Sequence, residues 1–337
     1  MRVIVDACGG DNAPLEILLG TAQAVSEYGI EAVLCGKEQE LRQLAAKKRI
    51  DLTGNITFAE AEGGMPPDAE ATDLLKKYPD CSMAVGLKLL AEGRGDAFVS
   101  AGNSGGLVVG ATFLVKRIKG VKRPAFASVL PSITGCYMLL DSGANLECRP
   151  EMLLQFGIMG AAYMQKVVGV ERPRVGLLNV GTEENKGLEL QLEAFALLQQ
   201  SPLHFLGNIE ARTVPMGECE VAVCDGFVGN MLLKLAEGVG EQLAYELKKL
   251  FLQSGLKGKL AGGLLQENLT GLRKHIDYTE YGGAPLMGIA KPVIKAHGSS
   301  NAKAFKNAIR QAASMHDTKV IDQIASEVAA MKASGVL

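Results

Sequence analysis

Four glycine-bearing loops carry the residues best suited to chemistry in this sequence. Each loop combines glycine with small amide or hydroxyl residues and precedes a stretch of helical period. They span residues 102–106, 180–187, 225–230 and 297–301. Glycine lets the backbone approach a ligand closely, and the first turn of a helix favours an anion. We expect the loops together to bind phosphate or a phosphorylated ligand, although each alone could be a capped turn.

Several side chains in these loops are candidates for catalysis. Lys186 can hold phosphate or polarise a carbonyl, with a solvated surface lysine as the alternative. His297 directly precedes Gly298, so it belongs to an anion-favouring loop, where a structural histidine is the alternative. Asn208 and Asn230 are neutral hydrogen-bond donors unless they serve turns or caps. We predict catalytic roles for Lys186, Asn230 and His297.

The sequence lacks the motifs of nucleotide binding, and no covalent nucleophile stands out. It contains neither the P-loop spacing nor the dinucleotide G-x-G-x-x-G pattern at its glycine loops. Cys224 lies within an apolar run, which favours a core position. We therefore predict no cofactor, and direct attack by a bound anion on a bound electrophile.

Four carboxylates end predicted strands or lie just beyond them: Asp6, Asp11, Asp141 and Asp225. Two or three carboxylates together can bind magnesium. Capping of helices and orientation of donors is the simpler role, so we predict no metal site.

Short apolar runs alternate with helical stretches along the chain. Such runs are typical of a mostly parallel sheet covered on both faces, which predicts a three-layer α/β fold. The carboxyl ends of its strands should carry the loops to one crevice. The expected strands cover residues 2–6, 32–35, 97–100, 136–140, 175–179, 203–206, 220–224 and 292–296. The expected helices include residues 14–28, 38–48, 151–168 and 231–250.

Composition narrows the class of protein further. The chain has 337 residues, a formal net charge of −2 and no tryptophan, which argues against nucleic-acid binding. Its seven cysteines form no C-x-x-C pair, as expected for reduced thiols in the cytoplasm. No apolar run reaches about 18 residues, and an apolar strand follows Arg2, which leaves no room for a signal peptide.

No linker interrupts the alternation, so we expect one catalytic domain over residues 1–337, with room for two lobes. Residues 246–281 fit the pattern least and are expected to protrude as a helical excursion. Leucines between residues 246 and 272 alternate there with lysines and glycines. This segment is predicted to contact either a second copy of the chain or a membrane surface.

The loops in their order along the chain resemble the PlsX-type phosphate acyltransferases. The resemblance covers nearly the whole chain, and the blocks at residues 224–230 and 297–300 are its most specific parts. It rests on DACGGD at 6–11, SAGNSG at 100–105, LDSGAN at 140–145, LNVG at 178–181, GNIE at 207–210, CDGFVGN at 224–230, YGGAP at 281–285 and HGSS at 297–300.

The resemblance implies a fold like that of phosphate acetyltransferases and isopropylmalate- or isocitrate-type dehydrogenases. It also implies a homodimer that moves a long-chain fatty acyl group from acyl carrier protein to inorganic phosphate. The acyl phosphate would feed phosphatidic acid and phospholipid synthesis. Contact with the membrane, and with a downstream glycerol-3-phosphate acyltransferase, is expected of such a protein.

On this hypothesis, glycines, hydroxyls, amides and carboxylates of the loops bind phosphate and substrate. These are Asp6, Gly102, Asn103, Ser104, Gly105, Asn208, Asp225, Gly229, Gly298, Ser299 and Ser300. The acidic carrier protein requires a basic surface. The candidates are Lys116, Arg117, Lys119, Lys122, Arg123, Lys257 and Lys259.

Three other functions remain open at this point. An enzyme acting on coenzyme A thioesters would use the same fold and the same anion loops. A non-catalytic protein that binds a phosphorylated metabolite would show phosphate binding without turnover. A dehydrogenase of the related fold is disfavoured because the nucleotide fingerprint is missing.

Overall fold

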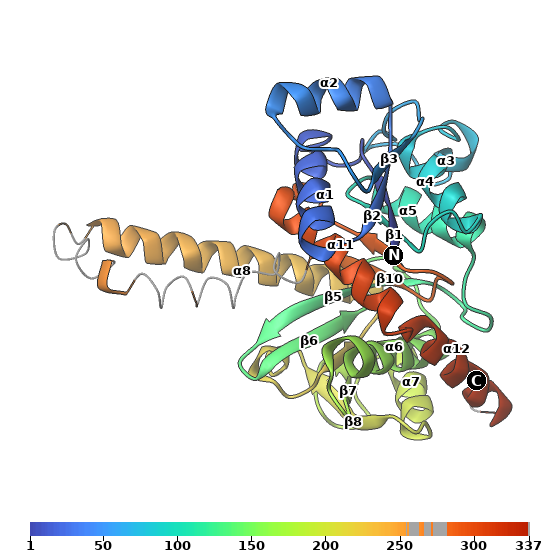
Figure 1. The fold of residues 1–337 in the computed structure, drawn as a ribbon. Helices are drawn as coiled ribbons and strands as arrows, with labels where there is room; N and C mark the ends of the chain where they lie inside the picture. Colours follow the sequence, from blue (N-terminus) through green and yellow to red (C-terminus); the bar gives the residue numbers. More distant parts are fainter. Residues whose placement is uncertain (254, 256–262, 266–270, 272–281, 336–337) are drawn as a thin grey trace.

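The computed structural model describes residues 1–253, 255, 263–265, 271 and 282–335 (Figure 1). Eleven strands among them form one mixed sheet. The strands are β1 (Arg2–Asp6), β2 (Glu31–Cys35), β3 (Ile56–Ala59), β4 (Ala97–Ser100), β5 (Ala125–Ser132), β6 (Gly135–Leu140), β7 (Arg174–Asn179), β8 (His204–Glu210), β9 (Val221–Val223), β10 (Ala284–Met287) and β11 (Val293–Lys295).

Helices connect most of the parallel strands. The α-helices that the structure describes are α1 (Leu15–Tyr28), α2 (Glu38–Lys48), α3 (Asp73–Lys76), α4 (Ser82–Ala91), α5 (Ser104–Gly110), α6 (Pro150–Tyr163), α7 (Glu189–Gln199), α8 (Gly226–Gln253), α11 (Ala302–Asp317) and α12 (Val320–Ala333). A π-helical turn extends α5 as far as Val115, and a second one extends α6 as far as Val168.

The strand order is β3-β2-β1-β4-β11-β10-β5-β6-β9-β7-β8. The first half-sheet, β3 to β11, is parallel throughout, and so is the second half-sheet, β6 to β8. Between them β10 pairs antiparallel with β11 and β5, and β5 pairs antiparallel with β6. The prediction of a mostly parallel α/β sheet is confirmed, with an antiparallel centre that the alternation of strands and helices did not indicate.

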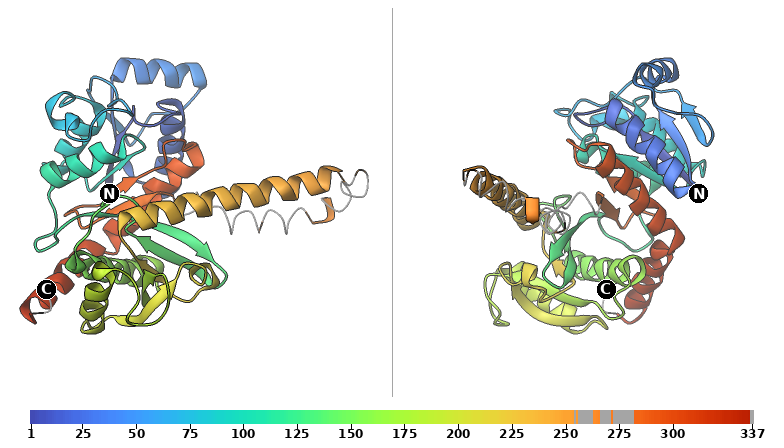
Figure 2. Two further views of the ribbon diagram at one scale, coloured as in Figure 1. Left: turned by 180° about the vertical axis from the view of Figure 1, so that it is seen from behind. Right: turned by 60° about the vertical axis from the view of Figure 1, so that its left-hand side comes forward.

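Helices cover both faces of the sheet because side chains alternate along each strand. In β1, Val3 and Val5 enter the large cluster beneath α1 and α11, whereas Ile4 packs on the other face beside Leu87 of α4. Helices α11 and α12 run along both halves and pack on α1 and α6 respectively (Figure 2). Apolar burial on both faces therefore joins the two halves around one crevice.

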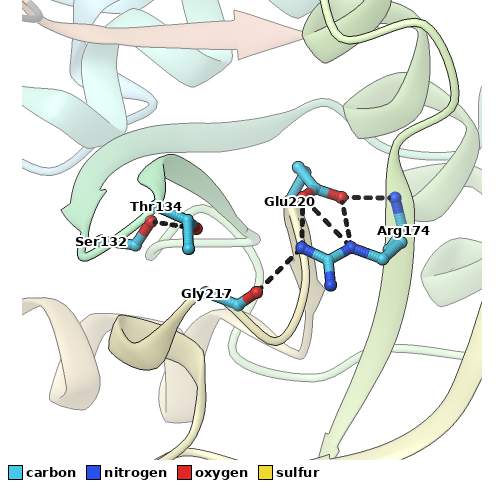
Figure 3. A network of polar contacts seen from close by, with 5 residues as sticks. All are labelled: Ser132, Thr134, Arg174, Gly217 and Glu220. Atoms are coloured by element: carbon cyan, nitrogen blue, oxygen red, sulfur yellow. Dashed lines mark hydrogen bonds and ion pairs between the residues drawn. The ribbon is translucent and has the colours of Figure 1, made fainter.

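A polar clamp holds the amino-terminal edge of the second half-sheet (Figure 3). The guanidinium of Arg174, the first residue of β7, donates from Nε to Glu220 Oε2 at 3.1 Å and from Nη2 to Gly217 O at 2.8 Å. The backbone N of Arg174 donates to the same carboxylate at 2.7 Å. Although burial opposes it, the hydrogen bonding of Arg174 lowers the pKa of Glu220. The clamp fixes the register of β7 against β9 at the end of the strands remote from the loops.

Helix α8 extends away from the body as a long rod (Figure 1). It begins at Gly226, five residues before the predicted start, because Asp225 caps its first turn by accepting from the N–H groups of Phe227 and Val228. Residues 246–253 of the predicted excursion form its far end, and most of residues 254–281 lie outside the described part. Within the described part of the chain, no helix is both long and apolar enough to span a bilayer.

Candidate functional site

A cavity of about 390 Å³ lies where the two half-sheets meet. The first half-sheet contributes the end of β11 and the loop 296–301, while Ser104 begins α5 beside them. The second half contributes Ser142 and Gly143 after β6, and Asn230 and Lys234 on α8. Strand β5 contributes the wall from Phe126 to Leu130. Three of the four loops predicted to bind an anion therefore reach one cavity, and the loop 180–187 does not line it.

The buried carboxylate of Asp141 shapes the loop that enters the cavity from β6. Its Oδ1 accepts from the backbone N–H groups of Phe126, Gly143 and Ala144, each at 3.0 Å. Its Oδ2 accepts from the backbone N and the Nδ2 of Asn145, at 2.7 and 2.8 Å. Burial raises the pKa of Asp141, and these hydrogen bonds oppose the rise. Five donors use the acceptor capacity of the carboxylate, so its role is to order backbone.

Asp6 does the same for the first half-sheet. Its carboxylate accepts from Ser82 Oγ at 2.5 Å and from Ser100 Oγ at 2.6 Å, and Ser100 Oγ in turn accepts from the backbone N of Gly102 at 3.0 Å. Burial raises the pKa of Asp6, while the hydrogen bonds from Ser100 and Ser82 lower it. The chain from Asp6 through Ser100 to Gly102 fixes the loop that leads into α5.

The loop after β11 is held in place by the loop after β1. Asp11 donates its backbone N–H to Gly298 O at 2.8 Å, and Asn12 Nδ2 donates to Ser299 O at 3.0 Å. Within the loop, the His297 Nδ1 lies 2.8 Å from Ser299 Oγ and accepts from the backbone N of Ser299 at 3.3 Å. Partial burial, followed by the charge of Lys234, lowers the pKa of His297. The imidazole is therefore neutral at pH 7.

The predicted site residues fall into three groups. The residues that line the cavity are Ser104, Asn230, His297, Gly298, Ser299 and Ser300. Others support its walls: Asp6 and Asp225 as described, Asn103 as the cap of α5, which accepts from Gly106 N at 2.8 Å, and Gly102, Gly105 and Gly229, where a Cβ would meet Met83, Ala71 and the carbonyl oxygen of Asp141. Lys186 and Asn208 are not among the lining residues.

Asn208 and Lys186 lie at the far side of the second half-sheet. Asn208 was predicted to follow its strand but lies within β8, because that strand continues to Glu210. Its Nδ2 donates to Glu183 O at 2.8 Å, and its buried Oδ1 has no hydrogen-bond partner in the described part of the chain. Lys186 is exposed in the loop after β7, where its carbonyl accepts from Asn179 Nδ2 at 3.0 Å. A catalytic role for Lys186 stays a prediction.

Sequence reasoning missed Lys295, the last residue of β11. It was counted as part of an apolar run, yet it lines the cavity. Its Nζ donates to Ala101 O at 3.1 Å and to Ala296 O at 2.5 Å. Burial lowers its pKa to about 8, although Asp6 and Asp11 act in the opposite direction. The signal that was available is a lysine at the carboxyl end of a buried parallel strand.

Cys224 carries no sign of nucleophilic character. Burial, followed by the charges of Asp225 and Asp141, raises the pKa of its thiol well above the ordinary value. Its Sγ lies 3.6 Å from the carbonyl oxygen of Asp141, beneath the loop that follows β6. Thiolate is the reactive form of cysteine, so this side chain contributes packing.

Known proteins agree with this architecture. Residues 1–323 match the family described as fatty acid synthesis protein. The phosphate acyltransferase of Thermoanaerobacter pseudethanolicus is 46% identical over 332 residues, which is 98% of both chains. The chain belongs to the phosphate acyltransferase family. The phosphate acyltransferase of Acetivibrio thermocellus is 43% identical to this chain over 337 residues. The alignment covers 100% of this chain and 99% of that relative.

Solved structures share the fold at low identity. A phosphotransacetylase from Streptococcus pyogenes superposes with a TM-score of 0.66 at 18% identity, covering 96% of this chain and 94% of that one. The EutD phosphotransacetylase from Staphylococcus aureus gives 0.60 at 18% identity, with 93% of each chain covered. The family resemblance and the predicted phosphate acetyltransferase fold are both confirmed.

His297 is expected to titrate below its ordinary pKa of 6.5, because partial burial and the nearby ammonium of Lys234 disfavour the imidazolium. Lys234→Met removes the positive charge and should raise the His297 pKa towards 6.5. Long-range ¹H–¹⁵N NMR over a pH series measures both values, with His297→Gln assigning the resonance. A wild-type midpoint at or above 6.5 would contradict this description of the site.

Proposed function

We propose that this chain transfers a long-chain fatty acyl group from acyl carrier protein to inorganic phosphate. The product, an acyl phosphate, would serve phosphatidic acid and phospholipid synthesis. One observation carries the proposal: in a chain of the phosphate acyltransferase family, the cavity at the junction of the half-sheets brings the loop 297–301 together with Ser104 and Asn230. The backbone N–H groups and hydroxyls gathered there suit a tetrahedral anion.

The chemistry needs only positioning and charge. A phosphate oxygen attacks the thioester carbonyl carbon, the new C–O bond forms, and the C–S bond breaks as the electron pair leaves with the thiolate of the carrier's arm. Asn230, in the second turn of α8, is proposed to stabilise the oxyanion of the tetrahedral intermediate. The neutral His297 is proposed to orient the phosphate through a hydrogen bond. A thioester already carries the required energy, so the proposal includes no redox cofactor and no metal.

Lys186 and Asn208 keep a proposed role at the margin of the site. The loop 180–187 leaves the carboxyl end of β7, which is the edge of the second half-sheet that also carries Gly143 and Asn230. An exposed lysine in that loop can reach the carrier's acylated arm as it enters. Asn208 holds the loop through its bond to Glu183 O. We propose that Lys186 polarises the thioester carbonyl from this side.

The experiment that tests the function is release of free thiol from palmitoyl-carrier protein with and without inorganic phosphate. Phosphate-dependent release with acyl phosphate as product is expected. Preference for a coenzyme A thioester would favour the first rival function, and phosphate binding with neither donor turned over would favour the non-catalytic one.

In the same assay, Asn230→Ala should reduce turnover by about a hundredfold, the usual effect of losing an oxyanion donor.

Lys186→Ala is tested beside Asn230→Ala, with Lys47→Ala as the matched control. Lys47 is exposed near the end of α2 and lies outside the cavity. Near-normal turnover in both Lys186→Ala and Asn230→Ala would refute the residue assignment while leaving the overall reaction intact.

A basic segment after α5 is proposed to bind the acidic carrier protein. It consists of exposed residues between the π-helical turn and β5: Lys116, Arg117, Lys119, Lys122 and Arg123. The second predicted group, Lys257 and Lys259, lies outside the described residues. Opposite charges on the two surfaces would accelerate association and make it sensitive to salt.

Reversal of charge in this segment should raise the KM for the carrier protein and leave the KM for phosphate unchanged. Lys119→Glu with Arg123→Glu is the informative variant, because neither side chain has a described hydrogen bond to lose. Lys47→Glu with Lys48→Glu on α2 is the control. Equal carrier KM values in the variant and the wild type at low ionic strength would refute the docking surface.

Helix α8 is proposed to form a homodimer interface. An apolar stripe at four-residue spacing remains exposed along it and consists of Phe227, Met231, Leu235, Val239 and Leu243. A soluble monomer rarely leaves a continuous stripe of this kind uncovered.

We further propose a cytoplasmic protein that contacts the membrane and a downstream glycerol-3-phosphate acyltransferase through the segment 246–281.

Sedimentation tests both the dimer interface on α8 and the membrane contact of the segment 246–281. The wild type should sediment as a dimer and Leu235→Glu with Val239→Glu as a monomer, because each charge would be buried unpaired in the interface. With anionic vesicles added, the wild type should pellet with the lipid. A monomeric wild type would refute the interface, and a wild type that stays in the supernatant would refute the membrane contact.

A further inference from the structure

Lys295 occupies the junction of the two half-sheets. It ends β11, where it lies in register with Ser100 of β4 on one side and with Ala284 of β10 on the other. The backbone of β11 therefore fixes the start of its side chain at the point where the parallel first half-sheet meets the antiparallel centre. Ala284 and Ala296 line the cavity beside it. The position of Lys295 is set by the sheet and not by a mobile loop.

The ammonium of Lys295 has carbonyl partners but no ion pair among the described residues. Ala101 O and Ala296 O accept two of its three N–H donors. Within the described part of the chain, no carboxylate comes within ion-pair distance of Lys295. The Asp6 carboxylate nearby is committed to Ser82 and Ser100. A desolvated charge without a counter-charge is unfavourable, which explains why burial lowers the pKa of Lys295 to about 8.

The other charged residues of the cavity do not supply the missing anion. Lys234 on α8 pairs with Glu237 Oε2 at 2.7 Å, so these two cancel. His297 is neutral at pH 7, as described above. Lys295 is thus left as the unbalanced charge among the described residues that line the cavity.

Ser300 adds a second unsatisfied group. Its backbone N donates to His297 O at 3.0 Å, but its side-chain Oγ is buried and has no hydrogen-bond partner among the residues that the structure describes. Only 5% of the residue is exposed, and it lines the same cavity as Lys295. Burial of a hydroxyl without a partner is unfavourable, so such groups in native proteins usually mark a ligand or water position.

We propose that Lys295 Nζ and Ser300 Oγ together form the subsite that binds the phosphate anion used as the acyl acceptor. A tetrahedral phosphate placed there supplies the counter-charge for the ammonium and an acceptor for the hydroxyl. Lys295, and not Lys186, then provides the positive charge for phosphate, and Lys186 remains available for the acyl donor. The role in turnover rests on the proposed function, whereas the binding of phosphate does not.

The proposal implies a characteristic dependence on pH. The pKa of Lys295 is lowered, so the ammonium is present below about 8 and is lost as the pH rises through that value. The charged groups that face it are Asp6 and Asp11 from the β1 end and Lys234 from α8. His297 titrates below 6.5, outside this window. Phosphate affinity should therefore fall above pH 8, and Lys295→Arg should abolish that fall because arginine stays charged.

The test is titration of the full-length protein with inorganic phosphate, followed by ³¹P NMR in the absence of any acyl donor. Lys295→Met should weaken binding by about ten- to a hundredfold, the range for a lost charge-assisted hydrogen bond, and Ser300→Ala by a smaller factor. Lys291→Met is the matched control. Its Nζ donates to Leu90 O at 2.8 Å, and it does not line the cavity.

Phosphate binding by Lys295→Met within twofold of the wild type would overturn the proposal. So would a Lys295→Met variant that binds phosphate normally but shows a raised KM for the carrier protein, because the subsite would then hold the phosphate of the carrier's arm. Thermal unfolding monitors the fold, and Lys295→Arg supplies the pH readout if the methionine variant does not fold. The titration measures phosphate binding without an acyl donor. Its result therefore stands even if the wild type fails to transfer an acyl group, so failure of this proposal and failure of the proposed function are distinguishable.

Discussion

The buried carboxylates at the ends of β1 and β6 accept hydrogen bonds from the protein itself, and the rest of the site depends on this. Asp141 uses both oxygens to order the turn through Asn145, and Asp6 uses both to hold Ser82 and Ser100. Among the described residues, neither carboxylate forms an ion pair with a cation that lines the cavity, and the charge of Asp6 acts on Lys295 from beyond ion-pair distance. The rigid loops therefore present N–H groups, hydroxyls and one unbalanced ammonium to whatever occupies the space between the half-sheets.

The carboxylates order the loops, and the loops present hydrogen-bond donors to the cavity. A sheet with few polar residues can therefore support chemistry on an anion. The strands are buried on both faces, so polar groups are concentrated where the strands end. The two parallel half-sheets supply loops to a shared crevice, and the antiparallel β5 and β10 join them. On the proposed function, the acyl donor approaches along the second half-sheet and α8, while the first half-sheet holds the anion.

Much of the fold could be predicted from the sequence. Residues 2–6 and 97–100 coincide with β1 and β4, because apolar runs bounded by glycine loops are a strong local signal. The strands β3, β5 and β10 were missed. Strand β5 carries Pro131 and two serines and is followed by a tight hairpin, and β10 has only four residues. Pairing in an antiparallel centre depends on distant partners, which local periodicity does not reveal.

The site was predicted in part, for the same reason. The glycine-bearing loops correctly indicated that Ser104, Asn230 and residues 297–300 lie at the cavity. Glycines that allow a close approach of the backbone to a ligand can be recognised in the sequence. Asn208 was misplaced because the end of β8 is set by its pairing with β7 as far as Glu210. Lys295 was missed because its chemistry arises from burial and from the lack of an ion-pair partner among the described residues, and both are properties of the tertiary structure.

The proposed reaction requires that phosphate itself attacks the acyl carbonyl in this cavity. Mass spectrometry of the product formed from ¹⁸O-labelled inorganic phosphate and palmitoyl-carrier protein tests it most directly. Direct attack yields an acyl phosphate that retains all of the label, including the oxygen that joins phosphorus to the acyl carbon. Free fatty acid carrying oxygen from water, with the phosphate left unreacted, would contradict it.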